Sequence, residues 1–472
     1  MVINSSGLLG PQAAHTQSLV DSIYLNGFAL DASETGTGKT YCAAAVAREL
    51  NRPVVVICPK AVMPAWTKVF NLFGISPLLL INYEKIGRGN TPHMKWKKLP
   101  NPEKPWDEKA KISMPDFRIP REALVVLDEG HKCKGADTTN SWMLVALVNQ
   151  NYNVLMSSAT AACSPMEMRA FGYMTGLHSL HNFREFCRMH GAEWLGRYGA
   201  MVWDAGSNAA RESMLRLNEY LYDTRKCASR MTREQFGVLF PESHVVAESY
   251  DLGPTATKNL QHAESVMEYE LAQLEEKCEG YSEHIFAIMT RYRRHSELLK
   301  VPMFVDMIED LFDEGKSIAV FVNYDDTVQA ISKLLREMPK FKGLIGYVVG
   351  GQNADVREKD IQAFQSDQKR VIIANTAAGG VGISLHDLNG KHPRASIISP
   401  TWSAQNMMQC LGRIWRQGGQ SKSYQRIVYA SGVGIEEKIC LRVQFKLNCL
   451  NTLNDGDLAE HVLWLEAAPL LA

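Results

Sequence analysis

A glycine-rich octapeptide near the N-terminus constrains the fold more than any other feature of this sequence. Ser33-Glu34-Thr35-Gly36-Thr37-Gly38-Lys39-Thr40 follows a short apolar run, 28–30, and precedes an alanine-rich stretch. A strand, a glycine-rich turn and a helix in this order direct backbone N–H groups and a helix N-terminus at a phosphate. The octapeptide therefore predicts a phosphate-binding loop at the end of a parallel strand in an α/β sheet.

Each residue type in this loop has a chemical reason to be there. Gly36 and Gly38 let the backbone approach a phosphate, Lys39 neutralises β- and γ-phosphate charge, and the Thr40 hydroxyl suits a Mg²⁺ ligand. The general pattern has glycine where this chain has Ser33, so a glycine-rich turn without a ligand is the alternative. The predicted nucleotide-binding residues of the loop are Ser33, Thr35, Gly36, Thr37, Gly38, Lys39 and Thr40.

A pair of carboxylates follows a second apolar run. Val125-Val126-Leu127 leads into Asp128-Glu129-Gly130-His131. A buried strand that ends in two acidic residues suits a hard cation beside a water-activating base. We expect Asp128 to hold Mg²⁺ through water and Glu129 to polarise the attacking water. Surface acidic pairs are common, but the buried strand favours the catalytic interpretation, with ATP and Mg²⁺ as cofactors.

Short apolar runs bounded by turn residues form two series along the chain, which is typical of buried parallel strands. The first series is 28–30, 53–58, 78–81, 124–127 and 154–156, and the second is 318–322, 345–349, 371–374, 395–398 and 427–430. The 472 residues suit two domains of about 150 to 200 residues each plus accessory segments. The sequence therefore predicts two tandem α/β domains, with a helix-rich stretch between the two series.

Further motifs carry a resemblance to a known family. With Ser158-Ala159-Thr160 after the run 154–156, the loop and the carboxylate pair resemble motifs I, II and III of superfamily-two helicases. In the second half, 375–385 (NTAAGGVGISL) resembles motif V of the Swi/Snf-like branch, and 409–418 (QCLGRIWRQG) resembles motif VI. The chain thus resembles Swi/Snf-like superfamily-two helicases and translocases in a compact two-lobe form, as in phages or viruses. The resemblance implies two tandem RecA-like domains, which are parallel sheets flanked by helices, with helical insertions near the lobe junction.

The resemblance also implies roles for single residues at the ATP site. Arg413 and Arg416 would act as arginine fingers, because a planar guanidinium from the second lobe can meet the developing γ-phosphoryl charge when the lobes close. An isolated arginine pair three residues apart is otherwise typical of a solvated helix face. Gln17, or alternatively Gln12, would read adenine. The implied catalytic residues are Lys39, Asp128, Glu129, Gln409, Arg413 and Arg416, and Gly382 joins the nucleotide-binding set.

On the nucleic-acid side, the resemblance implies contacts from residues of both lobes. Cys58-Pro59-Lys60, followed by Trp66, resembles motif Ia, and Asn82-Tyr83-Glu84 resembles the segment that follows it. The implied nucleic-acid-binding residues are Lys60, Asn82, Thr376 and Trp402. His131, Ser158 and Thr160 would couple the state of the γ-phosphate to nucleic acid, although hydroxyl residues also commonly end strands.

The motif order predicts the domain boundaries. We expect an N-terminal lobe over 1–245 with a helical insertion at about 161–235, a helical connection over 246–300 and a C-terminal lobe over 301–450. Residues 451–472 form a tail without a recognisable motif. The proline-rich segment 88–121 carries nine Lys/Arg against four Asp/Glu and contains Trp96, Trp106 and Phe117. We expect a long exposed loop, which either binds nucleic acid by charge and base stacking or is simply solvated.

The function that these motifs favour is an ATP-dependent DNA helicase or translocase that unwinds or branch-migrates DNA in replication, recombination or repair. The alternatives are a duplex-DNA translocase that strips proteins without separating strands, and a weakly hydrolysing scaffold subunit. Ser158-Ala159-Thr160 stands where Swi/Snf-like members carry Thr-Gly-Thr-Pro, and no histone-reading module is recognisable, which disfavours chromatin remodelling. The expected partner is single-stranded, forked or duplex DNA, with RNA left open, and proteins of replication, recombination or transcription are further candidates.

Composition narrows the cellular setting. Lys plus Arg equals Asp plus Glu at 51 each, so nucleic-acid binding must come from a local patch. Ten scattered cysteines without a C-x-x-C pair indicate a reducing compartment and no structural metal. The N-terminus lacks signal-peptide character, and no apolar stretch is long enough to span a bilayer. We therefore expect no membrane partner and a location in the cytoplasm of a bacterium or phage-infected cell, or in the nucleus for a eukaryotic virus, without secretion.

Overall fold

The computed structural model describes residues 7–89, 91–135, 137–194, 201–275, 281–376, 382–431 and 434–459. The chain forms two compact units. Within the described residues, the first comprises the chain up to Gly237 together with 445–459, and the second is built from Val238–Gln444. None of the helices in the described ranges combines the length and the apolar character that crossing a bilayer requires.

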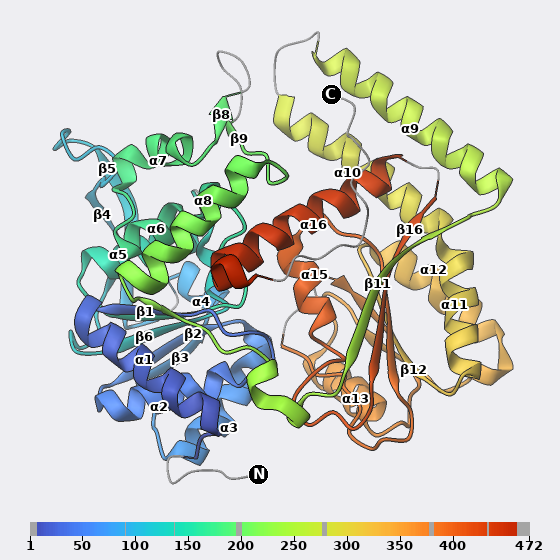
Figure 1. Ribbon diagram of the computed structural model, residues 1–472, viewed down its shortest axis with the longest axis horizontal. Helices are drawn as coiled ribbons and strands as arrows, with labels where there is room; N and C mark the ends of the chain where they lie inside the picture. Colours follow the sequence, from blue (N-terminus) through green and yellow to red (C-terminus); the bar gives the residue numbers. More distant parts are fainter. Residues whose placement is uncertain are drawn as a thin grey trace. The chain divides into compact units, whose positions relative to one another are not determined.

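The first unit is built on a six-stranded parallel sheet in the order β10-β1-β7-β6-β2-β3 (Figure 1). Its strands are β1 (Phe28–Asp31), β2 (Val54–Cys58), β3 (Leu79–Asn82), β6 (Leu124–Asp128), β7 (Asn153–Ser157) and β10 (Ala228–Ser229). Its helices are α1 (Gly10–Asn26), α2 (Lys39–Leu50), α3 (Met63–Phe73), α4 (Tyr83–Gly87), α5 (Thr139–Asn149), α6 (Arg169–Thr175), α7 (Phe183–Met189), α8 (Asn208–Glu219) and the end of α16 (Gly434–Asp455).

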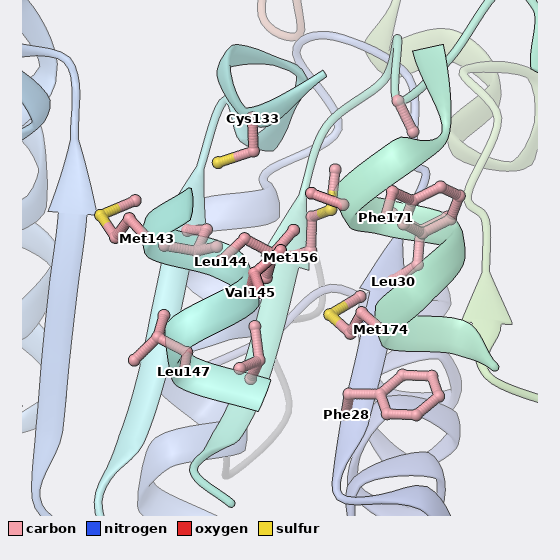
Figure 2. Packing of buried hydrophobic residues seen from close by; sticks show 14 of the residues in the cluster. Phe28, Leu30, Cys133, Met143, Leu144, Val145, Leu147, Met156, Phe171 and Met174 are labelled. Atoms are coloured by element: carbon pink, nitrogen blue, oxygen red, sulfur yellow. The ribbon is translucent and has the colours of Figure 1, made fainter. Parts of the chain in front are cut away.

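Both faces of this sheet are buried. Successive side chains of a strand point to opposite faces, and Val55 and Val56 of β2 accordingly lie in two different hydrophobic clusters. Figure 2 shows the cluster that contains Val55, where Leu144 and Val145 of α5 and Phe171 of α6 pack over the sheet. Burial on both faces explains why the strands appear in the sequence as continuous apolar runs.

The second unit contains another six-stranded parallel sheet, in the order β11-β16-β15-β12-β14-β13. Its strands are β11 (Ser243–Tyr250), β12 (Ser317–Val322), β13 (Ile345–Val348), β14 (Val371–Asn375), β15 (Arg394–Ile398) and β16 (Ser423–Ala430). Its helices are α9 (Pro254–Glu275), α10 (Tyr281–Leu299), α11 (Val301–Asp313), α12 (Asp325–Glu337), α13 (Ala354–Gln365) and α15 (Ala404–Leu411). The prediction of two parallel α/β sheets is confirmed, and all ten predicted apolar runs lie on strands.

Segment 88–121 was wrongly predicted to be a loop. It contains an antiparallel hairpin of β4 (Met94–Pro100) and β5 (Lys111–Phe117), which pair from Met94 with Phe117 to Pro100 with Lys111. Met94 and Phe117 are anchored in the hydrophobic core of the first unit. The prolines that favoured a loop are tolerated because both strands of a two-stranded sheet are edges.

Three further stretches differ from the predicted organisation. The connection expected to be helical over 246–300 begins with β11, which pairs with β16 from Ser243 to Tyr250. The insertion expected to be helical over 161–235 contains the short antiparallel pair β8 (Glu193–Trp194) and β9 (Met201–Val202), as well as β10. Residues 451–455 continue α16 rather than starting a tail, and Leu453 is buried. Residues 460–472 lie outside the described residues.

Candidate active site

The phosphate-binding loop joins the end of β1 to the start of α2, as predicted. Gly36 and Gly38 have φ angles of 90° and 92°, which side chains disfavour. A Cβ atom at Gly38 would lie 2.3 Å from Nε2 of Gln12, so only glycine fits this position. The Lys39 ammonium donates to the carbonyls of Ser33 and Glu34 at 2.8 and 2.9 Å and therefore lies over the loop backbone.

Ser33 departs from the general pattern for a structural reason. Its side chain is buried, and its Oγ accepts from the Met231 backbone N–H at 3.0 Å and lies 3.2 Å from Nε2 of His15. The same His15 nitrogen lies 3.1 Å from Oδ1 of Asp31, which accepts from the Ser33 N–H at 3.0 Å. The first residue of the loop thereby ties α1 and the segment after β10 to the end of β1.

Asp31 is the charged group at the centre of this network. Its side chain has no exposed surface. Burial alone raises the pKa of Asp31, but His15 and then Lys39 lower it, and the balance leaves the pKa below its usual value. The carboxyl group is therefore ionised at neutral pH, which favours hydrogen-bond donation to it by the Ser33 N–H.

Of the two candidate glutamines, Gln12 and not Gln17 contacts the phosphate-binding loop. Gln12 is buried, donates to the Thr37 carbonyl at 2.9 Å and accepts from the Leu9 N–H at 2.9 Å. Gln17, the first choice from the sequence, is exposed and donates to Asp21 one helical turn away at 2.8 Å. The two side chains point in different directions because residues five positions apart do not lie on the same helical face.

Two arginines missed by the residue-level predictions brace the loop. Arg233 donates through Nε to the Thr35 carbonyl at 3.1 Å and through Nη2 to the Thr35 hydroxyl. Arg230 donates to the Ala32 carbonyl at 2.8 Å and pairs with both carboxylate oxygens of Asp455 at 2.5 and 3.0 Å. No local signal linked these residues to the loop or to Asp455.

Asp128 ends β6 and Glu129 directly follows it, and Asp128 is held by an aromatic residue. Trp66 of α3 is buried and donates its indole N–H to Oδ2 of Asp128 at 2.8 Å. Burial, followed by repulsion from Glu129, raises the pKa of Asp128 to about 6.

The nearby groups fit a divalent cation. Carboxylate and hydroxyl oxygens such as those of Asp128 and Thr40 are the ligands that Mg²⁺ prefers. A bound cation would stabilise the ionised forms of Asp128 and Glu129 against burial and mutual repulsion. Thr40 is the second residue of α2 and is half-buried. The predicted metal-binding pair is thus compatible with the structure of the loop and of β6.

The predicted coupling residues converge on one atom. Nδ1 of His131 lies 3.3 Å from Oε2 of Glu129, 3.1 Å from Oγ of Ser158 and 3.4 Å from Oγ1 of Thr160. Asp128 pairs with Ser157 across β6 and β7, which places the two strand ends side by side. A single nitrogen cannot hydrogen-bond well to three groups at once. A movement of the Glu129 carboxylate would therefore change which of these three groups hydrogen-bonds to His131.

Glu129 itself has an unusual backbone. Its φ is 54° and its ψ 49°, in the left-handed region that residues other than glycine seldom adopt. Holding a non-glycine residue there costs on the order of 1 kcal/mol or more, and such positions cluster at active sites. The conformation turns the chain directly after β6 and starts the short helix at Gly130.

Of the four residues predicted to contact nucleic acid, one is exposed, one is half-buried and two are buried. Lys60 is exposed after β2, and Trp402 is half-buried between the guanidinium groups of Arg293 and Arg442. Asn82 is buried and caps α4 by accepting from the Lys85 N–H, and Thr376 is buried and donates to the Val322 carbonyl. The predictions for Asn82 and Thr376 need correction, because these side chains satisfy the backbone at strand ends.

The motif VI residues lie at the end of α15 and just after it in the second unit. Gln409 and Arg413 are buried, and Arg413 donates to the Ile383 carbonyl at 3.1 Å. Arg416 is half-buried, and Gly382 is exposed with a φ of 71°. Arg416 also acts on His386, whose pKa falls to about 4, first through burial and then through this arginine. Residues 377–381 of motif V lie outside the described residues.

Comparison with known proteins identifies the family. A family model described as the helicase conserved C-terminal domain matches residues 300–418. A putative ATP-dependent RNA helicase of Acanthamoeba polyphaga mimivirus is 31% identical over 467 residues, which cover 97% of this chain and 85% of that protein. The chain belongs to the superfamily-two helicases, in the Swi/Snf-like branch. This helicase is accordingly an ATP-hydrolysing enzyme, and its two sheets are the cores of two RecA-like lobes.

Other similar proteins cover different shares of this helicase. The DNA repair and recombination protein RAD54-like of Danio rerio is 22% identical over 378 residues, or 71% of this chain and 50% of that protein. The helicase thus spans about half the length of that relative. The solved SWI2/SNF2 ATPase core of Sulfolobus solfataricus in complex with dsDNA aligns with 97% of this chain and 96% of its own, at 16% identity and a TM-score of 0.36.

Proposed function

We propose that this helicase is a DNA-dependent ATPase that moves along DNA and unwinds or branch-migrates it in replication, recombination or repair. The convergence of Glu129, Ser158 and Thr160 on the His131 imidazole carries the proposal, because it joins the hydrolytic residue to two residues that could relay its state. The name of the Danio rerio relative, a DNA repair and recombination protein, supports DNA as the substrate.

ATP binding would begin with a rearrangement of Lys39. Its ammonium now donates to two loop carbonyls, and it would exchange these for oxygens of the β- and γ-phosphates. The N–H groups of the loop and the start of α2 would bind the same phosphates. Mg²⁺, held by Thr40 and by Asp128 through water, would supply further charge neutralisation.

Hydrolysis would be carried by Glu129. Its carboxylate would orient and polarise the attacking water, and its separation from His131 would change with the presence of the γ-phosphate. When Glu129 turns toward the water, His131 can hydrogen-bond more closely to Ser158 or Thr160. This exchange of partners would transmit the nucleotide state to the residues after β7.

Arg413 and Arg416 remain our proposed arginine fingers. A guanidinium group that stabilises the transferring phosphoryl group only in the closed state would make hydrolysis depend on lobe closure. Replacement of Arg413 by lysine keeps the charge but removes the planar fork. We expect this variant to bind ATP and to lose most of its stimulated hydrolysis.

An ATPase panel tests the proposed function. The rate is measured without nucleic acid and with single-stranded DNA, duplex DNA, forked DNA, a four-way junction and RNA. Strong stimulation by DNA that is abolished in Lys39→Ala would support it. The control Lys68→Ala, at an exposed lysine of α3, should keep the stimulation. If RNA stimulates the ATPase more than any DNA does, the substrate in our proposal becomes RNA, in line with the name of the mimivirus relative.

The same substrates separate the alternatives. Displacement of a labelled strand from forked DNA supports unwinding, whereas removal of a bound protein from duplex DNA without strand release supports the nucleoprotein-stripping translocase. If no nucleic acid stimulates the ATPase rate, the remaining alternative is the weakly hydrolysing scaffold subunit. Binding should weaken steeply with salt, because lysine and arginine contacts to phosphates release condensed counterions.

A further inference from the structure

The β4–β5 hairpin is firmly fixed to the first unit. Arg169, whose side chain is 3% exposed, pairs with Glu103 in the turn of the hairpin and lies over the Trp142 ring at 4.3 Å. The Gln150 side chain accepts from the Phe117 N–H at 2.9 Å and donates to the Pro115 carbonyl at 2.8 Å. The hairpin can therefore present its outer side chains in defined positions.

Those outer side chains are largely lysines. Within the described part of the chain, no carboxylate lies within 4.0 Å of the exposed amines of Lys95, Lys98, Lys104, Lys109 or Lys111. Two of the four acidic residues of 88–121 are taken up by other partners, since Glu103 pairs with Arg169 and Asp116 with Lys97. A local cationic surface thus exists on a chain whose formal net charge is zero.

A large aromatic residue stands at the turn of this hairpin. Trp106 lies between Lys104 and Lys109 in the sequence and is followed directly by the exposed Asp107 and Glu108. The exposed fraction of its surface is 71%. Its ring meets His181, in the short helix before α7, edge-on at a centroid distance of 6.0 Å. The exposed indole face is therefore available for stacking on a ligand.

A second exposed tryptophan continues the same surface. Arg184 follows His181 by three residues and lies over the Trp194 ring of β8 at 5.6 Å, and Trp194 is 46% exposed. Figure 1 places the β4–β5 hairpin, α7 and β8 along one side of the first unit. Among the tryptophans of the described ranges, Trp106 and Trp194 are the two that are highly exposed.

We propose that Trp106, His181, Arg184 and Trp194, with the hairpin lysines, form a binding surface for unpaired nucleotides. We call it the tryptophan surface. Bases would stack on the two indoles while the lysines and Arg184 neutralise phosphates, a combination that binds single strands without regard to sequence. The inference rests on the proposed function and deepens it, because a hold on unpaired bases distinguishes strand separation from movement along an intact duplex.

The chemistry favours a nucleic-acid strand over a protein partner. Tryptophan and arginine are also common at the centres of protein interfaces, but lysine is depleted there. Five exposed lysines whose amines have no carboxylate within 4.0 Å instead match the regular phosphates of a strand. Paired bases present only their edges in a groove, so indole rings can stack fully only on bases that have left the duplex.

The test is equilibrium binding of the full chain to a fluorescently labelled single-stranded oligonucleotide and to a blunt duplex. We expect Trp106→Ala and Trp194→Ala each to weaken single-strand binding roughly 5- to 100-fold while duplex binding is unchanged. Trp106→Phe keeps a stacking ring and should recover most of the affinity. The control is Tyr24→Ala on α1, an equally exposed aromatic residue at 64% that should have no effect.

Salt dependence supplies a second readout. Lys104→Gln with Lys109→Gln removes two phosphate contacts, so the slope of log affinity against log salt should become shallower by about 1.4 for a single strand. Basal ATPase activity and the thermal melting midpoint should stay at the wild-type values, because these side chains are exposed and lie outside the loop and β6.

The outcomes separate failure of this inference from failure of the proposed function. Single-strand affinity that is unchanged in both tryptophan variants would overturn the tryptophan surface, as would a wild-type chain that responds to duplex DNA but binds no single strand. In both cases the proposed ATPase function would stand. If no nucleic acid stimulated the ATPase or bound to the chain, the proposed function would fail and this inference with it.

Discussion

Replacing Ser33 by glycine restores the general phosphate-loop pattern, and we predict that it harms this protein. Ser33 has no positive φ angle that would call for glycine. Its hydroxyl instead accepts the buried Met231 N–H and lies against His15. In Ser33→Gly the Met231 N–H loses this partner in a buried setting. A change toward the common residue should therefore weaken the site.

The loss of folding stability in Ser33→Gly has two contributions. Leaving a buried donor without its partner costs about 1–3 kcal/mol. The added backbone freedom of glycine in the unfolded chain costs about 0.5–1 kcal/mol. We expect Ser33→Gly to lower the free energy of unfolding of the first unit by about 1.5–4 kcal/mol, and Ser33→Ala by about 1–3 kcal/mol, because alanine loses only the hydroxyl.

The assay follows the first unit through its own ligand. Urea unfolding is monitored by the loss of a fluorescent ATP analogue and by intrinsic tryptophan fluorescence, and the KM for ATP is measured at several nucleic-acid concentrations. We expect a lower urea midpoint and a KM raised several-fold in both variants. Ser33→Gly as stable as the wild type, with an unchanged KM, would refute the role assigned to the Ser33 hydroxyl.

Three further predictions test other parts of the structure. Glu129→Gln should reduce stimulated ATPase activity by about 10²- to 10⁴-fold while binding of the ATP analogue persists, and a near-normal rate would remove Glu129 from the catalytic step. Asp455→Asn should destabilise the first unit by about 1.5–3 kcal/mol, because it weakens the ion pair with Arg230. A double-mutant cycle with Arg230→Met measures the coupling energy of this pair. A coupling energy near zero would show that the pair does not stabilise the first unit. Burial, with a smaller contribution from Arg216, lowers the pKa of His190 to about 4. Because the pKa of His190 in the folded state lies below the ordinary 6.5, the unfolded chain binds a proton at His190 more readily than the folded chain does. The neutral His190 therefore contributes fully to the stability of the folded state above about pH 6.5, and this contribution is lost as the pH falls toward 4. Melting midpoints between pH 7 and 4.5 should fall less steeply in His190→Gln, and identical slopes would contradict the shift.

Much of the fold could be predicted because its signals are local. The ten apolar runs lie on strands, since a strand buried on both faces needs several consecutive apolar residues. Gly36 and Gly38 have the positive φ angles that the phosphate loop requires. The hairpin of 88–121 was missed because its proline content outweighed its alternating pattern, and β11 was missed because the helical stretch that follows dominated the interpretation.

Within the candidate site, the predictions succeeded where adjacent strands bring motifs together. Asp31 of β1 and Asp128 of β6 each pair with Ser157 of β7, so the residues that follow these strands meet at one edge of the sheet. Asn82 and Thr376 were placed at strand ends, but their side chains turn inward to backbone partners. A motif places a residue along the chain without fixing where its side chain points.

The sequence by itself determined the chemistry of this protein, from the phosphate loop and the carboxylate pair to the two parallel sheets. The tertiary structure alone decided which residues hold that chemistry in place. His15 meets Ser229 and Arg230 meets Asp455 across more than two hundred residues of chain. Strand periodicity and loop geometry are set by neighbouring residues, whereas a contact between distant residues depends on how all the intervening elements pack.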